Sequence, residues 1–413
     1  MTIEIQNVQR LRVWTESTFA SDGTGTLGNY TDVPFIEGSM TASLDQEMLD
    51  PQTAQQRKDG MVAKVLGKKS AKLTFSMHLA ATGADTTDGN TAAQSALGEI
   101  LSAVMGGENL ATGTAADTGS TTTSIVADTA YSTDTITNGC AIGLLSGASA
   151  AYEMRELSTI TTVTGTPKIA VSNAPNSADD IYATATYYLT DTSTVSHLQF
   201  IVEGAEQDDR WLVLGCQAES VAIEISNDQL PKITFTFMGA DWMHGADTAG
   251  TLTGSALGAA TYTNLSLTRV FGELLIQTNG TSTRPSPTCA SSFTVTPQIK
   301  YEPVPCPSGT NGIAQFLRMR AVPVMAGSFT TYYPDTTWFD HRDSSTALGI
   351  FYQIGNVAGS TVLLSFPTVQ VTNVQRVDDG GRAAQKVDFE CRLDTHTTGT
   401  SDLTDSAFRI HLG

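Results

Sequence analysis

The densest group of polar side chains in the sequence is Asp-His-Arg-Asp at residues 340–343. An imidazole beside carboxylates can transfer protons or bind a metal ion. Because Arg342 stands between the acids, a salt-bridged loop is the plainer interpretation. Asp241, Trp242 and His244 form a similar group, which we interpret as a strand end with a packed tryptophan. Neither group predicts a catalytic site.

Common signatures of catalysis and metal binding are missing from the sequence. It holds no P-loop, no GxSxG elbow and no HExxH helix. Its five cysteines are widely spaced, without a CxxC pair, so they do not indicate a zinc site. We expect Cys216 and Cys391 to be buried thiols, with a disulfide between Cys289 and Cys306 as the less favoured alternative. The sequence thus predicts a protein that is not an enzyme and uses no metal or cofactor.

The composition favours strands and large subunit contacts. Charged residues make up only 16% of the 413 residues, and the length suits two or three domains. The net charge of −19 is concentrated in residues 1–245, which hold 12 basic and 29 acidic side chains. An excess of acid does not hold nucleic acid, because phosphate binding needs Lys and Arg. It favours solubility or, alternatively, a passage through which DNA slides without sticking.

The beginning of the chain carries no targeting signal that we can identify. Residues 1–7 lack the basic start and apolar core of a signal peptide. The sequence also has no run of about 18 apolar residues, so we expect no membrane insertion. Folding in a reducing cytoplasm is the expectation that fits these features and the unpaired cysteines.

Two stretches of the sequence follow the same pattern. Phe200–Ile225 and Pro231–Asp241 predict a strand, a turn, a long strand, a turn and a strand that ends at an aspartate. Phe351–Val374 and Gln385–Asp394 repeat this order. We interpret the repetition as a duplicated β-module, which is typical of ring-forming structural proteins. A chance likeness between β-rich segments is the alternative.

The predicted fold is mainly β, with two β-sandwich or barrel modules and an inserted small β-domain. The first module covers residues 1–110 and 196–245, the insert 111–195, a linker 246–260 and the second module 261–413. Short alternating segments between turn signals favour a folded, outward-facing insert over a disordered loop. The insert strands are expected at Thr123–Val126, Cys140–Leu145, Met154–Thr162, Lys168–Val171 and Ile181–Leu189.

One helix is predicted, in the first module. Thr91–Met105 places Leu97, Leu101 and Val104 on one face. Asn90 or Thr91 would cap its beginning, and glycines follow its end. In the second module, Trp338–Asp343 is expected to be a loop, and Ser344–Phe351 could supply one helical turn.

A long connection, Asp45–Lys69, separates the first two strands of the first module. Connections of this length in compact domains are usually functional. Its charged side chains are the candidate site residues: Asp45, Glu47, Asp50, Arg57, Lys58, Asp59, Lys64, Lys68 and Lys69.

The order of these elements resembles the tail tube, or major tail, proteins of long-tailed bacteriophages. The most specific part is Gly215–Ile225 followed, after a turn, by Ile233–Ala240. The resemblance covers residues 39–105 and 196–245. The second module follows the same plan at Ser365–Leu393, but Phe366-Pro367 stands where the first module has Gly-Cys.

The resemblance implies a structural virion protein. In this family, modules form a ring of six whose inner strands make a continuous barrel, and stacked rings conduct DNA into the host. Two modules per chain would give a homotrimer with pseudo-six-fold symmetry. The connection Asp45–Lys69 would contact a neighbouring subunit or the next ring. The implied location is the virion tail, after synthesis in the cytoplasm of the host bacterium.

The implied partners are further copies of the chain and other tail proteins, with double-stranded DNA passing through without specific binding. The insert at 111–195 could decorate the outer wall or contact the host surface. Two alternatives remain open. One is a ring component of the tail tip or baseplate hub, and the other is a carbohydrate-binding β-sandwich adhesin.

Overall fold

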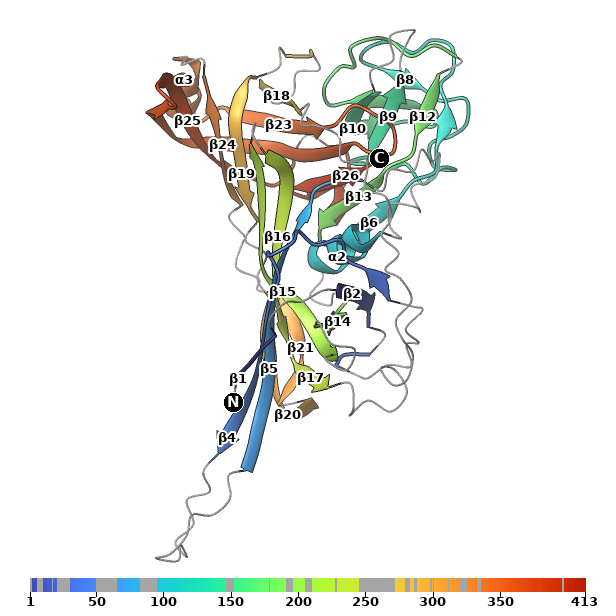
Figure 1. Ribbon diagram of the computed structural model, residues 1–413. Coiled ribbons are helices and arrows are strands. Elements are labelled where there is room, and N and C mark those ends of the chain that lie inside the picture. Colours follow the sequence, from blue (N-terminus) through green and yellow to red (C-terminus); the bar gives the residue numbers. More distant parts are fainter. Residues whose placement is uncertain are drawn as a thin grey trace, which may run out of the picture.

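A computed structural model describes residues 2–5, 10–16, 18–20, 30–49, 65–81, 95–145, 152–177, 179–190, 196–204, 210–226, 229–244, 272–278, 283–285, 288–297, 299, 301–310, 312–318, 325–332, 336–395 and 397–413. Over these residues the protein is mainly β, as predicted. The strands form an 18-stranded sheet, a 6-stranded sheet and a two-stranded hairpin (Figure 1). The predicted linker 246–260 lies outside the described residues.

The first part of the large sheet is an antiparallel array. In spatial order it consists of β4 (Thr41–Leu49), β5 (Val65–His78), β16 (Gln229–Gly239) and β15 (Arg210–Ser226). The array forms because apolar and polar residues alternate along each strand. On β16, Ile233, Phe235 and Phe237 are fully buried, whereas Thr234 and Thr236 face the opposite side.

The second part of the sheet repeats this order. It consists of β19 (Ala290–Thr296), β22 (Ala326–Thr331), β25 (Arg382–Cys391) and β24 (Val362–Asp379). Phe389 on β25 packs over Gly327 on β22, where a Cβ atom would lie 2.4 Å from the ring. The two arrays therefore share one strand order, although their sequences differ.

Both long strands, β15 and β24, bend at a bulge. The register of β15 slips beside Gly215, which has φ 60°, and the register of β24 slips beside Pro367. Glycine adopts positive φ without a steric penalty. Proline has no N–H to donate and is accepted in sheets at bulges. The substitution of Phe366-Pro367 for the Gly-Cys pair thus retains a bulge at this place.

Further strands cross behind the two arrays. They are β2 (Arg10–Thr15), β3 (Thr31–Asp32), β14 (Leu198–Glu203) and β17 (Asp241–His244) behind the first array, and β18 (Gly272–Thr278) and β23 (Ala347–Ile354) behind the second. β1 (Thr2–Ile5) pairs with the outer edge of β4. β20 (Tyr301–Thr310) and β21 (Ile313–Arg318) form the separate hairpin.

The helix of the first array, α2, spans Ala96–Met105. Its apolar face, including Leu97 and Leu101, is buried as predicted. The predicted N-cap at Asn90 or Thr91 was wrong, because the Ser95 hydroxyl accepts a hydrogen bond from the Gly98 N–H at 3.0 Å and begins the helix. This serine provides a side-chain oxygen for a backbone N–H of the first turn, which has no partner within the helix. The predicted glycine stop is confirmed, since Gly106 ends the helix with a φ of 84°.

The second array has its own short helix, α3, at Thr337–Asp343. The prediction of a loop at Trp338–Asp343 was therefore wrong, and most of Ser344–Phe351 belongs to strand β23 rather than to a helical turn. None of the residues of α3 is buried. Only Trp338 and Phe339 of this helix pack against the core, so the segment is too short in apolar residues to show the periodicity from which a helix could be predicted.

The small sheet lies within the predicted insert. Its order is β7 (Thr114–Ala115), β12 (Asp180–Tyr182), β9 (Ala141–Leu145), β10 (Tyr152–Ile160), β11 (Thr164–Pro167) and β8 (Ile125–Val126). Lys168–Val171 does not form the expected strand, because the chain turns away after Pro167. The expected strand Ile181–Leu189 is divided between two sheets, since its second half, β13 (Ala185–Leu189), joins the large sheet.

The C-terminal strand joins the two halves of the molecule. β26 (Arg409–Leu412) pairs with β13 on one side and with β24 on the other, and β13 also pairs with β6 (Gly106–Leu110). A one-turn helix, α4 (Asp402–Asp405), precedes it. Figure 1 shows the C terminus beside the small sheet, far from the β4–β5 hairpin.

Candidate functional site: an assembly surface

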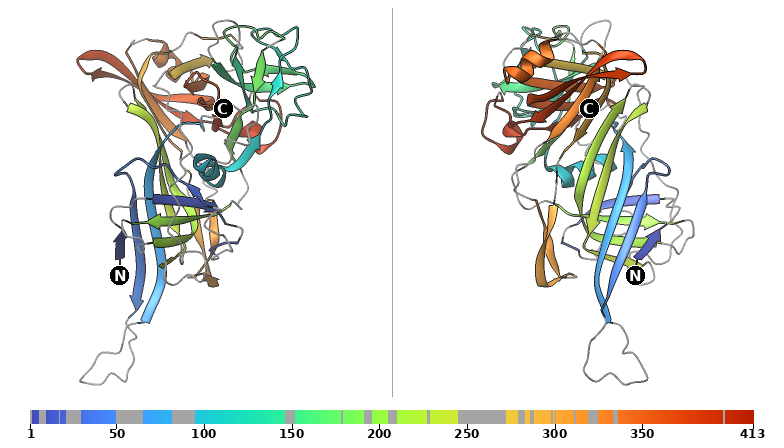
Figure 2. Two further views of the ribbon diagram at one scale, coloured as in Figure 1. Left: turned by 45° about the vertical axis from the view of Figure 1, so that its right-hand side comes forward. Right: turned by 90° about the vertical axis from the view of Figure 1, so that its left-hand side faces the viewer.

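The charged connection predicted at Asp45–Lys69 is partly a pair of long strands. Figure 2 shows the β4–β5 hairpin extending away from the body of the protein. Gln46 on β4 pairs with Lys69 on β5, so the described ends of the connection are paired strands, with a bulge between Gln46 and Met48, and not loop. The predicted site residues Asp45 and Glu47 lie on β4, and Lys68 and Lys69 lie on β5. The others, Asp50, Arg57, Lys58, Asp59 and Lys64, fall outside the described residues.

Lys69 and Asp45 hold the base of this hairpin against β17. The Lys69 ammonium lies 4.7 Å from the centre of the Trp242 ring and donates a hydrogen bond to the Trp242 carbonyl at 3.0 Å. The Trp242 indole N–H donates to the Asp45 carbonyl oxygen at 3.1 Å. This is the packed tryptophan expected from the sequence. These contacts give Lys69 a structural role at the base of the arm.

The end of the hairpin exposes apolar side chains. Met48, Leu49, Val65 and Leu66 are 44%, 48%, 54% and 63% exposed. We call these four residues the apolar tip. Clustered exposed apolar residues indicate a contact surface. Sequence reasoning missed them because it considered only charges. The sequence feature that could have predicted them is the presence of two apolar pairs, Met48-Leu49 and Val65-Leu66, near the two ends of the long connection.

The two arrays are joined by strand pairing within the chain. β15 pairs antiparallel with β19, from Ile223 opposite Val295 to Ser226 opposite Ser292. We call this pairing the repeat seam. It joins the last strand of the first array to the first strand of the second array. Such a seam is formed by backbone hydrogen bonds and by the alternation of apolar and polar side chains along each strand. It does not depend on one particular pair of side chains.

The corresponding strands at the two ends have edges that lack a strand partner among the described residues. Among the described strands, the part of β24 beyond Gln370 pairs with β25 alone. At the other end, β1 covers β4 only from Ala42 to Asp45. Unpaired strand edges are templates for pairing with another chain.

A buried group of charges joins the small sheet to the second array. It consists of Glu156 on β10, Lys168 after β11, Asp394 after β25, and Arg409 and His411 on β26. We call it the ionic seam. Arg409 lies 2.7 Å from Glu156 and 3.0 Å from Asp394, and Lys168 lies 3.0 Å from Glu156 and 2.5 Å from Asp394. The charges balance, with two acids and two cations.

The ionic seam fixes the protonation of its members. Burial would raise the pKa of Glu156, but Arg409 and Lys168 outweigh burial and hold it well below the ordinary value. Burial also acts to raise the pKa of Asp394, and Lys168 reverses the direction. For His411, burial lowers the pKa, so the imidazole is neutral near pH 7. Groups locked in this way stabilise one arrangement and are not poised to exchange protons.

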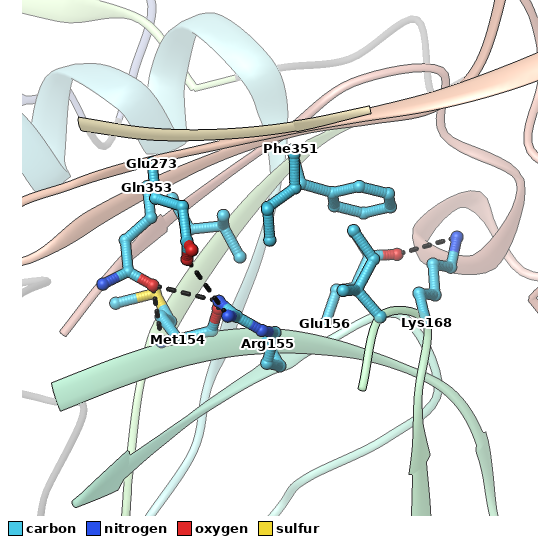
Figure 3. A pocket seen from close by; sticks show the side chains of 10 residues that line it. Met154, Arg155, Glu156, Lys168, Glu273, Phe351 and Gln353 are labelled. Atoms are coloured by element: carbon cyan, nitrogen blue, oxygen red, sulfur yellow. Dashed lines mark hydrogen bonds and ion pairs between the residues drawn. The ribbon is translucent and has the colours of Figure 1, made fainter. Parts of the chain in front are cut away.

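A second charged group lies next to the ionic seam. Figure 3 shows Arg155 of β10 reaching Gln353 and Glu273 on the second array. Arg284 contacts both Glu273 and Glu153. The cavity lined by Arg155, Glu273 and Gln353, among others, has a volume of about 10 Å³, enough for roughly one water molecule. The cavity therefore offers no room for a substrate.

The other candidate groups of the sequence are scattered over the described residues. Residues 340–343 lie on α3, where Arg342 pairs with Asp343 at 2.7 Å. No group of His, Cys, Asp and Glu within the described ranges has the geometry of a metal site. None of the five cysteines is part of a disulfide, so the alternative of a Cys289–Cys306 bond was wrong. Burial raises the pKa values of Cys216 and Cys391, as expected for thiols inside apolar strands.

Comparisons with known proteins assign no family. No family model and no curated protein matches the chain. A solved structure entitled "Structure of K. pneumonia MrkH in its apo state" aligns with 64% of this chain and 82% of its own, at 7% identity and a TM-score of 0.14. A likeness this weak carries no argument about fold or function. No helix in the described part of the chain is long and apolar enough to cross a membrane.

Proposed function

We propose that the protein is a phage tail tube subunit, a structural and non-enzymatic protein that assembles into stacked rings around a channel for DNA. The observation that carries the proposal is the repeat seam. One chain already joins two arrays of the same strand order through β15 and β19. The same pairing, made between chains, would join β24 of one subunit to Thr41, the first residue of β4, and to the residues just before it in the next subunit.

The registers of the two arrays identify the residues that would meet. Ile223 lies opposite Ile233 in the first array, and Val374 lies opposite Val387 in the second. Val374 thus corresponds to Ile223, and Asn373 corresponds to Ala222. The repeat seam pairs Ile223 with Val295, and the same register continued by one residue would place Ala222 opposite Thr296.

The partner of Asn373 follows from the first strand of each array. Thr296 lies opposite Ala326, and Thr41 lies opposite Thr74. Ala326 directly precedes Gly327, which lies opposite Phe389 of β25. Thr74 directly precedes Phe75, which lies opposite Phe235 of β16. Thr41 therefore corresponds to Thr296, and the proposal pairs Asn373 of one subunit with Thr41 of the next. The described pairing of β1 with β4 runs from Ala42 to Asp45 and does not include Thr41.

Repetition of one seam closes a ring when the rotation between arrays divides a full turn. A closed barrel has no exposed strand edges and so removes the risk of uncontrolled aggregation. In the proposal three chains supply six arrays, which gives a homotrimeric ring. The β4–β5 hairpin, with its apolar tip, would reach a neighbouring ring. The small sheet, anchored by the ionic seam, would lie on the outer wall.

Cysteine cross-linking tests the seam between chains. We expect Asn373→Cys with Thr41→Cys, in a Cys289→Ser background, to give covalent dimers and trimers under oxidation. Directly opposite residues in antiparallel strands bring their Cβ atoms about 4.5–5.5 Å apart, close to disulfide geometry. The matched control is Glu224→Cys with Thr294→Cys, which are paired within one chain and should cross-link without forming multimers.

Two results would decide against the proposal. One is a pair of cysteines at 373 and 41 that cross-links only within monomers or not at all, while the control pair forms its disulfide. The other is a series of cross-linked products that continues beyond the trimer. Single closed rings that never stack would instead favour a tail-tip or baseplate hub component.

A further inference from the structure

The hairpin of β20 and β21 is a separate two-stranded sheet with two edges of its own. Among the described strands, each of the two pairs only with the other. The right-hand view of Figure 2 shows the hairpin, in orange, apart from the long strands of the first array. Because it belongs to neither array, ring closure through β24 and the start of β4 would leave its edges as they are. Unpaired strand edges invite pairing with other chains.

The hairpin is anchored to the core of the subunit. The Tyr301 hydroxyl donates a hydrogen bond to the Val104 carbonyl of α2 at 2.9 Å. Tyr301 on β20 and Ile313 and Phe316 on β21 are buried and belong to the main core. The hairpin therefore has a defined position in the subunit, and each of its two edges can be considered in turn.

The edge of β21 is closed by a buried histidine. The Phe316 N–H points away from β20 and donates to the Nε2 atom of His197 at 3.3 Å. Burial lowers the pKa of His197 to about 4, so near pH 7 the imidazole is neutral and its Nε2 atom can accept this bond. The centre of the Phe19 ring lies 4.8 Å from that of the imidazole and 6.1 Å from that of the Phe316 ring. The middle of this edge therefore already has its partners within the chain.

The pairing register shows which way the backbone of β20 points. Pro303 on β20 lies opposite Phe316 on β21. Directly opposite residues in an antiparallel pair direct their polar backbone groups either towards each other or away from each other. Since the Phe316 N–H points away from β20, the nitrogen of Pro303 points away from β21. We call this side of β20, which faces away from β21, the outer edge.

Proline occupies three alternate positions along the outer edge. The Cys306 N–H donates to the carbonyl of Gly312, just before β21, at 2.9 Å. Its two neighbours, Pro305 and Pro307, therefore direct their nitrogens to the outer edge, as Pro303 does. All three prolines are exposed. Because proline has no N–H, the outer edge offers no backbone donor to another strand from residue 303 to residue 307, and proline is accepted in a strand at such an edge.

The two edges are thus closed by different means that have the same effect. We propose that the hairpin β20–β21 is a protected hairpin, closed to strand addition by other copies of the chain through the prolines of β20 and through His197 on β21. In the proposed ring, this restricts pairing between chains to β24 and the start of β4. The inference does not depend on the ring, since an open strand edge would invite pairing in a monomer as well.

Restoring backbone donors to the outer edge tests the inference. Pro303→Thr with Pro305→Thr returns two N–H groups to this edge, in a residue type that favours strands. Light scattering and thioflavin T fluorescence of the full-length chain over a concentration series would measure association. Two added hydrogen bonds of about 1 kcal/mol each should lower the concentration at which particles grow beyond the wild-type size about thirtyfold.

The matched control places threonine at the alternate positions of the same strand. In Val304→Thr with Cys306→Thr, the substituted residues direct their N–H groups towards β21, so the outer edge is unchanged. This variant should keep the wild-type particle size over the whole concentration series. The inference is wrong if the proline variant also keeps the wild-type size, or if the control associates as readily as the proline variant. Circular dichroism checks the fold of each variant, and Pro305→Thr alone provides the test if the double variant does not fold.

The mass of the wild-type protein separates this inference from the proposed function. Wild-type rings with no further association of the proline variant would contradict the inference alone. A wild type that stays monomeric, while the proline variant associates and the control does not, would uphold the protected hairpin and contradict the ring proposal.

Discussion

The repeat seam and the ionic seam both join parts of this chain, but they do so by different means. The repeat seam is a backbone pairing between β15 and β19, in which apolar pairs such as Ile223 and Val295 alternate with polar pairs such as Glu224 and Thr294. The ionic seam depends on Glu156, Asp394 and Arg409, which are buried and bonded to each other. A backbone seam can be repeated between copies of a chain, whereas a buried charge network fits a single partner. The repeat seam can therefore join subunits into an assembly, whereas the ionic seam can only hold the parts of one subunit together.

Breaking the ionic seam should have the largest effect on stability. In Arg409→Met, Glu156 and Asp394 lose a buried partner, and the carbonyls of Leu403 and Thr404 lose a donor. Removal of one partner from a buried pair costs about 3–5 kcal/mol. Urea denaturation followed by circular dichroism would measure this loss as a lower midpoint.

The control for that experiment is an exposed pair. Arg392, whose side chain is 55% exposed, lies 3.2 Å from Glu390. Arg392→Met should change the free energy of unfolding by less than about 1 kcal/mol. Equal losses for the two variants would show that the ionic seam does not hold the small sheet in place.

Acid should weaken the ionic seam before it affects the repeat seam. Burial lowers the pKa of His411 below its ordinary value of 6.5. The stability from the neutral imidazole is present above pH 6.5 and is lost as the pH falls towards the folded pKa. Because the unfolded state binds up to one more proton than the folded state, the free energy of unfolding should fall by at most about 1.4 kcal/mol per pH unit.

The measurement is the free energy of unfolding at several pH values between 6.5 and 5, for wild type and for His411→Gln. The variant should show a flatter dependence, because the group that takes up the proton is gone. His341→Gln, on the surface helix α3, provides the control and should keep the wild-type slope. An unchanged slope in His411→Gln would contradict the assignment of a neutral buried imidazole.

Removal of the Thr294 hydroxyl, within the repeat seam, should have the smallest effect on stability. Thr294→Ala removes the bond of 3.0 Å to Ser328 at an exposed site. Cross-strand pairs of this kind contribute about 0.2–1 kcal/mol, so the denaturation midpoint should shift only slightly. A loss as large as that of Arg409→Met would mean that the seam depends on specific side chains after all, and would weaken the case for its repetition between chains.

The strands of the arrays could be predicted because their alternation is strong. Ile233, Phe235 and Phe237 stand between Thr and Lys, and the sequence places the strand within a few residues of β16. The divided strand Ile181–Leu189 could not be predicted, because alternation does not reveal which sheet a strand joins. Only the pairing of β13 with β26, more than 200 residues later in the chain, settles it.

The candidate site was harder to predict than the fold. The sequence prediction chose Asp45–Lys69 because of its charged residues. In the structure Lys69 contacts Trp242, and the hairpin also exposes the four residues of the apolar tip. The ionic seam could not be predicted, because Glu156 and Arg409 are 253 residues apart. Ion pairs of this kind leave no local pattern, since each charge alone looks like an ordinary surface residue.

The central claim is that the repeat seam is made again between chains to close a ring. The most direct measurement is the mass of the purified full-length protein in solution, together with negative-stain electron microscopy of the same sample. The account predicts hollow rings that contain three chains and stack into tubes. Rings of six chains would contradict two equivalent arrays per chain, and a monomer that persists at high concentration would contradict assembly through the edges of β24 and β4.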